Sequence, residues 1–214
     1  AKKYGYSTWD MKKRYTVQME SGEVQMTLGQ IMALWATWNR ENTLGPEMSS
    51  HLTHGGFDAD VDLRDGLLGR KDIEKRAHRV DPTDMEAIGN LLTEEQKQFI
   101  DAVVGYMSTD MSELGNEASM AAYGIKLYKE SYYFPMKVWD GVKSARSDKG
   151  ISGTDENRMA HKGWSKRRRN NASNALVIGK FTQDAVNHIV EMINYNTMAP
   201  AVENMNKVMN YQFK

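Results

Sequence analysis

The feature that most constrains the fold is a helix-start pattern that occurs twice, at Thr27-Leu-Gly-Gln30 and at Thr93-Glu-Glu-Gln96. A Thr followed three residues later by Gln satisfies two backbone N–H groups in the first turn of a helix. Apolar residues at helical spacing follow each pattern. They are Leu28, Ile31, Met32, Trp35 and Trp38 after the first, and Phe99, Ile100, Val103, Val104 and Met107 after the second. The sequence therefore predicts two amphipathic helices with defined starts.

Other elements follow from local patterns. Residues 15–26 alternate between polar and apolar side chains around Ser21-Gly22, which predicts a small β-hairpin. Asp81 is expected to cap a short helix that begins at Pro82. A further helix is expected over about 111–129, although its glycines weaken the prediction.

The carboxy-terminal third is predicted to hold a long loop and two helices. Residues 140–175 are rich in Gly, Ser, Asp, Asn, Lys and Arg, which favours a flexible basic arm. Two helices then follow, separated by Pro200. The first is expected to bury Phe181, Val186, Ile189, Val190 and Ile193, and the second to use Val202, Met205, Val208, Met209 and Phe213. The predicted fold is a mainly α single domain over residues 1–214, with a small amino-terminal hairpin.

Composition excludes several classes of protein. The chain has 214 residues and no cysteine, so disulfides, thiolate metal sites and cysteine nucleophiles are ruled out. No apolar run reaches the ~18 residues of a membrane span, and the start has no secretory signal. Because the chain begins with Ala1 rather than Met, we interpret it as a processed product or a piece of a longer protein.

Charge is balanced overall but divided along the chain. Residues 81–120 carry nine acids against one base, Lys97, whereas residues 140–180 carry ten bases against four acids. Three interpretations stay open. The segments are two solvated faces, they attract each other within the fold, or the basic one meets an anionic partner.

The basic run Lys166-Arg167-Arg168-Arg169 is the strongest candidate contact site. Four adjacent cations can neutralise several phosphates, and the release of counterions would make binding steeply salt-dependent. Neighbouring side chains add an aromatic ring for stacking and amides for hydrogen bonds. These neighbours are Trp164, Asn170, Asn171 and Asn174. The segment is predicted to contact nucleic acid or a partner protein.

Metal and catalytic sites are not expected. His51-x-x-His54 and Asp58-x-Asp60-x-Asp62 invite a zinc or calcium site. However, an EF-hand needs Gly and Glu where this chain has Leu63 and Gly69, and two histidines are too few for a closed zinc site. No hydrolase, metalloprotease or Walker motif occurs. No cofactor or metal is therefore predicted.

Three histidines are candidates for a general base. His161 lies beside Lys162 and would serve a nuclease-type reaction, but no spacing selects it from His78 and His188. His188 falls within a predicted helix and is interpreted as a partly buried structural residue. Nuclease activity stays an alternative to a non-catalytic role.

Four segments of the chain carry a resemblance to a known family. They are Met26–Trp35, Leu92–Lys97 with Met107–Met120, Tyr132–Met136, and Ala172–Leu176 with the helix to Tyr195 and the ending Val208–Tyr211. In their order, which covers the chain from about residue 15 to residue 211, they resemble one region of the large multidomain polyvalent proteins encoded by phages and prophages of gut Firmicutes. One departure is Ala175, where the resemblance leads us to expect proline.

The resemblance implies a phage context, in the virion or the host cytoplasm, and a connecting or binding domain without catalytic residues. Such polyvalent proteins join helicase, methylase, nuclease and protease-like modules, and none of those motifs lies in this chain. We expect a macromolecule-binding domain that inhibits a bacterial defence system, such as a CRISPR effector. The basic loop would enter a nucleic-acid channel, or the acidic helices would mimic nucleic acid.

The competing hypothesis is a structural or ejection-associated segment of a phage virion. Fifteen methionines lie largely on apolar stripes, which suits an adaptable core or an interface. The expected partner is a protein or nucleoprotein, with nucleic acid contact and self-association as further expectations and no membrane.

Overall fold

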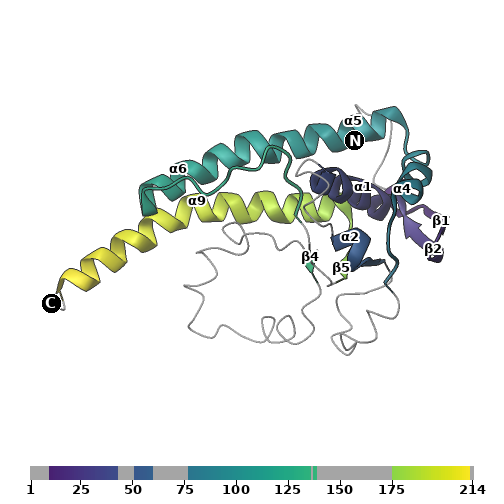
Figure 1. The fold of residues 1–214 in the computed structure, drawn as a ribbon. Helices are drawn as coiled ribbons and strands as arrows, with labels where there is room; N and C mark the ends of the chain where they lie inside the picture. The colour runs from purple at the N-terminus through teal and green to yellow at the C-terminus, as the bar shows by residue number, and fades with distance from the viewer. Residues whose placement is uncertain (1–9, 43–50, 60–76, 136, 139–174, 213–214) are drawn as a thin grey trace.

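The computed structural model describes residues 10–42, 51–59, 77–135, 137–138 and 175–212. Within them the chain is mainly helical, as predicted, and forms a compact head and an extended stem (Figure 1). The head contains the hairpin, a small sheet and three helices, α1 (Leu28–Asn42), α2 (His51–His54) and α4 (Pro82–Gly89). The stem contains α6 (Ser112–Tyr123) and the part of α9 (Phe181–Gln212) that follows Ala185, which run side by side. The helix α5 (Glu94–Tyr106) leads from the head into the stem.

The predicted β-hairpin is confirmed. Strands β1 (Arg14–Met19) and β2 (Gly22–Thr27) pair antiparallel, with Val17 opposite Val24. Gly22 follows the turn with φ 121°, a conformation that a residue without Cβ adopts at little cost. Alternate side chains face the head core and alternate ones face solvent, which is the period-2 pattern of a half-buried sheet.

Both predicted capping boxes are present. At α1 (Leu28–Asn42), the Thr27 amide donates to Gln30 Oε1 at 2.9 Å, and the Gln30 amide donates to Thr27 Oγ1 at 3.3 Å. At α5 (Glu94–Tyr106), Thr93 and Gln96 make the same reciprocal pair. These bonds satisfy amides that the helix itself leaves without partners.

The short helix α4 (Pro82–Gly89) also begins as predicted. The Asp81 carboxylate accepts from the amides of Thr83 and Asp84, at 2.7 Å and 2.8 Å. The Asp84 side chain accepts from the Glu20 amide at 2.9 Å, so the start of α4 is joined to the hairpin turn.

α5 continues into a π-helical segment, η3 (Met107–Met111), and then into α6 (Ser112–Tyr123). Within η3, the Ser108 hydroxyl donates to the Val104 carbonyl at 2.8 Å and accepts from the Tyr133 amide at 2.7 Å. The prediction that this helix reaches Lys129 is wrong. α6 ends at Gly124, which takes a left-handed conformation (φ 73°) that terminates helices.

The carboxy-terminal helix is one element rather than the predicted two. α9 (Phe181–Gln212) runs through Pro200, and Figure 1 shows it as a continuous ribbon. An interior proline removes one backbone hydrogen bond. Ala199 is buried in the stem just before Pro200, whereas most residues after Pro200 are exposed, so α9 continues there without being buried against α6.

A second small sheet was not predicted. It joins β3 (Phe57–Asp58), β5 (Leu176–Val177) and β4 (Lys137–Val138) in the order β3-β5-β4. β3 pairs parallel with β5, and β4 pairs antiparallel with it. Two-residue strands are too short to show alternation in a sequence. Two further short elements are η2 (Asp10–Lys12) and α2 (His51–His54).

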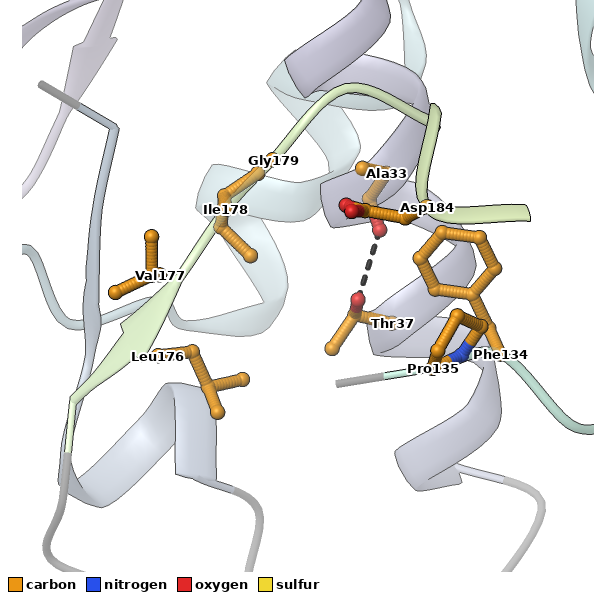
Figure 2. Close-up of a pocket in the computed structure, with 9 residues that line it drawn as sticks. All are labelled: Ala33, Thr37, Phe134, Pro135, Leu176, Val177, Ile178, Gly179 and Asp184. Carbon is orange, nitrogen blue, oxygen red and sulfur yellow. Dashed lines mark hydrogen bonds between the residues drawn. The ribbon is translucent and has the colours of Figure 1, made fainter. Parts of the chain in front are cut away.

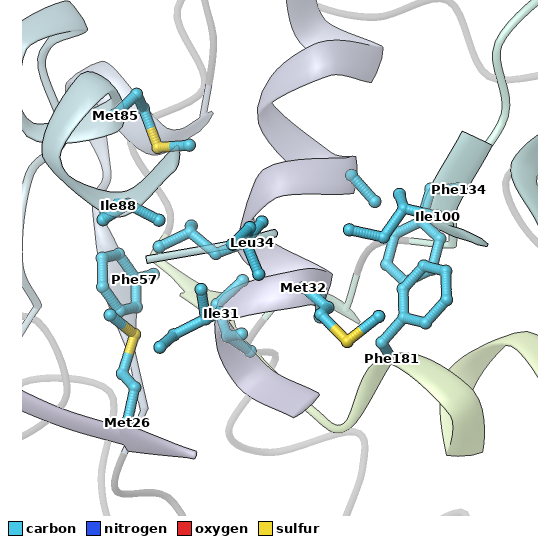
Figure 3. Packing of buried hydrophobic residues seen from close by; sticks show 14 of the residues in the cluster. Met26, Ile31, Met32, Leu34, Phe57, Met85, Ile88, Ile100, Phe134 and Phe181 are labelled. Carbon is cyan, nitrogen blue, oxygen red and sulfur yellow. The ribbon is translucent and has the colours of Figure 1, made fainter. Parts of the chain in front are cut away.

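The hydrophobic core is divided between the head and the stem. In the head, Phe57, Phe134 and Phe181 are fully buried, together with the inner face of α1 (Figure 3). Phe134 and Phe181 stack with ring centres 5.2 Å apart. The stem has a smaller cluster, formed by Met111, Ala118, Tyr128, Met192, Tyr195 and Ala199.

Candidate functional site

The predicted contact residues of the basic arm lie outside the described residues. They are Trp164, Lys166, Arg167, Arg168, Arg169, Asn170, Asn171 and Asn174. The same holds for the candidate base His161 and for Asp60 and Asp62 of the considered metal pattern. The candidate site is therefore sought on the described surfaces and cavities.

The described residues of the considered metal pattern do not come together at one site. His51 and His54 lie on α2, and Asp58 is buried in β3. Leu52, between the two histidines, is fully buried, so α2 is held by its apolar side chain. Among the described residues, no group of three or more His, Asp or Glu side chains is placed to hold a metal ion.

His188 belongs to a buried network at the junction of head and stem. The Arg40 guanidinium donates to Glu130 at 2.8 Å and 3.0 Å and to the Phe134 carbonyl at 2.7 Å. It also lies 4.5 Å from the Tyr133 ring, which contacts the His188 ring at 4.9 Å. Burial and the nearby Arg40 charge lower the pKa of His188 to about 4. This supports its interpretation as a structural histidine.

A hollow of about 400 Å³ lies beside the hairpin turn, lined in part by Glu20, Thr53 and Arg79. At its edge the Ser21 hydroxyl lies 3.3 Å from both His78 Nδ1 and the Arg79 carbonyl. A serine nucleophile needs a histidine that a third group orients. None of the described hydrogen bonds joins His78 to a carboxylate, so this pair lacks that group.

Two carboxyl groups of the hollow influence each other. Hydrogen bonds from Thr83 and the Asp84 amide lower the pKa of Asp81 to about 2. Asp81 in turn raises the pKa of Glu20, through a side-chain hydrogen bond and charge repulsion. The donors to Asp81 belong to the first turn of α4, so this arrangement primarily caps that helix.

A second cavity lies between α1, the start of α9 and β5 (Figure 2). It is lined by Thr37, Leu176, Gly179 and Asp184, among others, and the Thr37 hydroxyl donates to the Ala33 carbonyl at 2.8 Å. Its free volume is about 10 Å³, which is room for about one water molecule. It is therefore too small for a substrate or cofactor.

The stem presents an acidic ridge, defined by Asp101, Asp110, Glu113 and Glu117 on the exposed side of α5, η3 and α6. No Lys or Arg occurs from residue 98 to residue 124. Lys97, at the near end, pairs with Glu94 at 2.9 Å. From Asp101 to Glu117 the ridge spans seventeen residues, or about 24 Å at a rise of ~1.5 Å per residue.

The acids of the ridge face away from α9. On α6, Gly115, Ala118 and Ala122 are buried, whereas Glu113 and Glu117 are exposed on the other side. Glu113 and Glu117 are one helical turn apart, and Asp110 lies a similar distance before Glu113. Partial burial raises the pKa of Asp101. Asp110, Glu113 and Glu117 lie within seven residues of each other and form the densest part of a linear negative surface.

α9 carries an apolar stripe on the side that faces away from α6. Val186, Val190 and Ile193 are 54%, 49% and 47% exposed, so the prediction that they are buried is wrong. The helix instead buries Ala185, His188, Met192, Tyr195 and Ala199. At about 100° per residue, Val208 and Tyr211 continue the same stripe toward the carboxyl end.

α9 has two apolar faces, and its packing against α6 decides which of them is buried. α6 offers small residues, and a Cβ placed on Gly115 would lie 2.4 Å from Met192 and 2.5 Å from Tyr128. Long or aromatic side chains from α9 fill the space that these small residues leave. The branched aliphatic side chains of α9 are left exposed. The apolar periodicity of α9 alone does not show which of its two faces is buried.

The acid excess was visible in the sequence, but its arrangement on one ridge was not predicted.

No helix among the described ranges combines the length and apolar character needed to cross a membrane. Comparison with protein-family models, curated proteins and solved structures finds no match. The resemblance to phage polyvalent proteins therefore stays a prediction.

Proposed function

We propose that this protein is a non-catalytic binding domain whose acidic ridge occupies a cationic, nucleic-acid-binding surface of a nucleoprotein effector. The observation that carries the proposal is the ridge itself. Four acids lie along one exposed side of a helical rod that has no base from residue 98 to residue 124. In a bacterial host this activity would inhibit a defence complex such as a CRISPR effector.

The acids form a line of negative charge along the helix that is sparser than the phosphates of one nucleic-acid strand. Successive phosphates of one DNA strand are ~3.4 Å apart along the helix axis. Asp110, Glu113 and Glu117 advance about 4.5–6 Å per step along α6. The rod holds these charges on a rigid helix, so little conformational freedom is lost on binding.

The proposed origin follows from the resemblance to phage polyvalent proteins. A phage-derived domain that meets the host early would gain from blocking a defence nucleoprotein before it engages phage DNA.

The test compares a ridge variant with a matched variant elsewhere. Asp110→Asn, Glu113→Gln and Glu117→Gln together remove three charges from the ridge. Glu23→Gln, Glu86→Gln and Glu191→Gln remove three from exposed positions off the ridge. The wild-type protein and both variants are bound to a purified, guide-loaded CRISPR effector, and displacement of labelled target DNA is measured at increasing salt.

The wild-type protein and the off-ridge variant should displace DNA. The ridge variant should bind about threefold to a hundredfold more weakly, since each of the three exposed charge pairs contributes ~0.2–1 kcal/mol. The wild-type protein and both variants are also used to capture proteins from nuclease-treated host lysate, in order to find other nucleic-acid-binding partners. Equal binding by the ridge and off-ridge variants would overturn the proposal. Binding that leaves the partner's nucleic-acid affinity unchanged would favour the virion-segment hypothesis.

A further inference from the structure

We infer that Ser108 and Asn116 are positioning residues, which fix the direction in which the acidic ridge points from the head. Neither residue belongs to the ridge. Both bind the backbone of a strap, defined as residues 125–135, which returns from the end of α6 toward β4 in the head (Figure 1). The inference deepens the proposed function and rests on it, because it names the contacts that hold the ridge in place.

Ser108 joins the π-helical segment η3 to the strap. Its hydroxyl donates to the Val104 carbonyl at 2.8 Å and accepts from the Tyr133 amide at 2.7 Å. Bonds in a π-helix join residues five apart, so a π-helical turn moves backbone donors away from their α-helical acceptors. The hydroxyl therefore supplies a donor to the helix and an acceptor to the strap where the helix departs from α-helical geometry.

Asn116 makes a second contact with the strap, one residue before the ridge acid Glu117. Its side-chain amide donates to the Tyr128 carbonyl at 2.8 Å, and its side-chain carbonyl accepts from the Tyr128 amide at 2.9 Å. The Tyr128 ring is buried and lies edge-on to the Tyr195 ring of α9, with ring centres 5.9 Å apart. A Cβ on Gly115 of α6 would lie 2.5 Å from the Tyr128 ring. The strap therefore packs against both helices of the stem.

The other end of the strap is fixed in the head. The Phe134 ring is fully buried, and the Phe134 carbonyl accepts from the Arg40 guanidinium of α1 at 2.7 Å. Arg40 also binds Glu130 at 2.8 Å and lies 4.5 Å from the Tyr133 ring. A helix that is bonded to this segment at two levels makes both sets of bonds at one rotation about its axis, and the head sets that rotation.

These bonds define the rotation of α6 more sharply than apolar packing does. Apolar attraction has no preferred direction, whereas a hydrogen bond weakens steeply as its angle departs from the preferred one. Asp110, Glu113 and Glu117 all lie in η3 or α6. A rotation of α6 would therefore move three acids of the ridge relative to Asp101 and to the head.

The first test measures the direction of α6 by spin-label distances in the purified chain. Because the chain has no cysteine, labels attach only at introduced sites, Glu86→Cys on α4 and Ala121→Cys on α6, both of which are exposed. Ser108→Ala should shift or broaden the distribution of label distances. Ser108→Thr keeps the hydroxyl and should restore the wild-type distribution.

Ser119→Ala is the matched control. Ser119 is fully buried on α6, and its hydroxyl donates to the Asn116 carbonyl of the same helix at 3.1 Å. None of the described hydrogen bonds joins it to the strap, so this variant should keep the wild-type distances. Far-UV circular dichroism checks the helix content of every variant. If Ser108→Ala loses helix content, Asn116→Ala, which removes the second contact, takes its place.

The second test asks whether the positioning acts on the partner through the ridge. In the assay with the guide-loaded effector, Ser108→Ala should weaken displacement of labelled DNA about threefold or more. In the ridge variant, which already lacks the charges of Asp110, Glu113 and Glu117, the same substitution should have no further effect. Ser119→Ala should leave displacement unchanged in both backgrounds.

Two results would overturn the inference. One is an unchanged distribution of label distances in both Ser108→Ala and Asn116→Ala, whether or not the ridge binds a nucleoprotein. The other is an equal loss of displacement with and without the ridge charges, because Ser108 would then act elsewhere. If the wild-type chain displaces no DNA, the proposed function fails, and the label distances alone decide whether these two residues orient α6.

Discussion

The head packs the first turns of α9 with aromatic rings, whereas the stem packs the rest of the helix with glycine, alanine and serine. Phe181 lies between Phe134 and Phe99, at ring distances of 5.2 Å and 5.8 Å, and is fully buried. Farther along, Met192 and Tyr195 lie against the small side chains of α6. The head encloses its helix, and the stem covers only one side of it.

Because of this difference, the head supplies most of the stability and the stem carries the exposed faces that can bind a partner. Large side chains buried on all sides supply most of the hydrophobic stabilisation of a small domain. A two-helix stem buries little, but it holds two outward faces rigidly, one acidic and one apolar. We therefore expect substitutions in the head to change folding, and substitutions on the outer faces of the stem to change binding.

The substitution expected to have the largest effect on stability is Phe181→Ala. Removing a fully buried ring should lower the free energy of unfolding by about 3–5 kcal/mol. Met192→Ala in the stem should cost about 2 kcal/mol, because its cluster is small and can collapse around the cavity. Val186→Ala, at an exposed site, should change it by less than about 0.5 kcal/mol. Urea denaturation measures all three, and equal losses at Phe181 and Met192 would refute the division.

The junction between head and stem can be tested with pH. His188 has a pKa of about 4 when folded and an ordinary value of 6.5 when unfolded. Above pH 6.5 both states are neutral, and as pH falls toward 4 only the unfolded state gains the proton. The free energy of unfolding should fall by about 2–3 kcal/mol over that range through this group.

His188→Met should remove that part of the pH dependence, whatever its effect at neutral pH. His54→Gln is the control, because His54 is exposed. Urea unfolding at about pH 7 and about pH 4.5 gives the comparison. If the variant and the wild-type chain lose the same stability between these pH values, the His188 ring is not kept neutral by burial.

Two glycines on the same helical rod give a matched test of stem packing. Gly115→Ala should destabilise by about 1–3 kcal/mol, because its Cβ would meet Met192 and Tyr128 closer than 3 Å. Gly105→Ala meets nothing within 4 Å and should stabilise by up to about 1 kcal/mol through helix propensity. Thermal unfolding measures the two shifts, and the same sign for both would contradict the close contact of α6 with α9.

The smallest expected effect is at the helix that joins the two regions. Thr93→Ala removes the hydroxyl that accepts from the Gln96 amide and should cost about 1 kcal/mol. Thr93→Ser keeps the hydroxyl and should restore most of the loss. Measured by urea denaturation, a cost equal to that of Phe181→Ala would mean that α5 depends on its cap more than on its packing.

The features that the sequence predicted correctly are encoded within a few residues of each other. The Thr27 and Thr93 boxes, the Asp81 cap and the hairpin turn each join groups no more than a few positions apart. Such bonds form whatever the rest of the chain does. The predictions that failed depend on distant partners. Only the packing of α6 decides which side of α9 is buried, and the continuation of α9 through Pro200 is not indicated by the local proline signal.

The candidate surfaces were predicted in part. The acid excess of residues 81–120 follows from composition, but its grouping on one ridge depends on the rotation between α5 and α6. The branched side chains of the stripe are typical of a core and were assigned to one. The basic run Lys166–Arg169 lies outside the described residues, so its predicted contact with nucleic acid stays a prediction.

The π-helical segment Met107–Met111 changes the direction in which the side chains of α6 point relative to those of α5. It holds one more residue than an α-helical turn, so it turns everything after it relative to α5. Deleting a single residue there would rotate all of α6 by about 100° while leaving its composition unchanged. Gly115 would leave its contact with Met192, and the acids would turn toward another side. The alignment of the two outward faces is thus set by one residue in a rod of thirty.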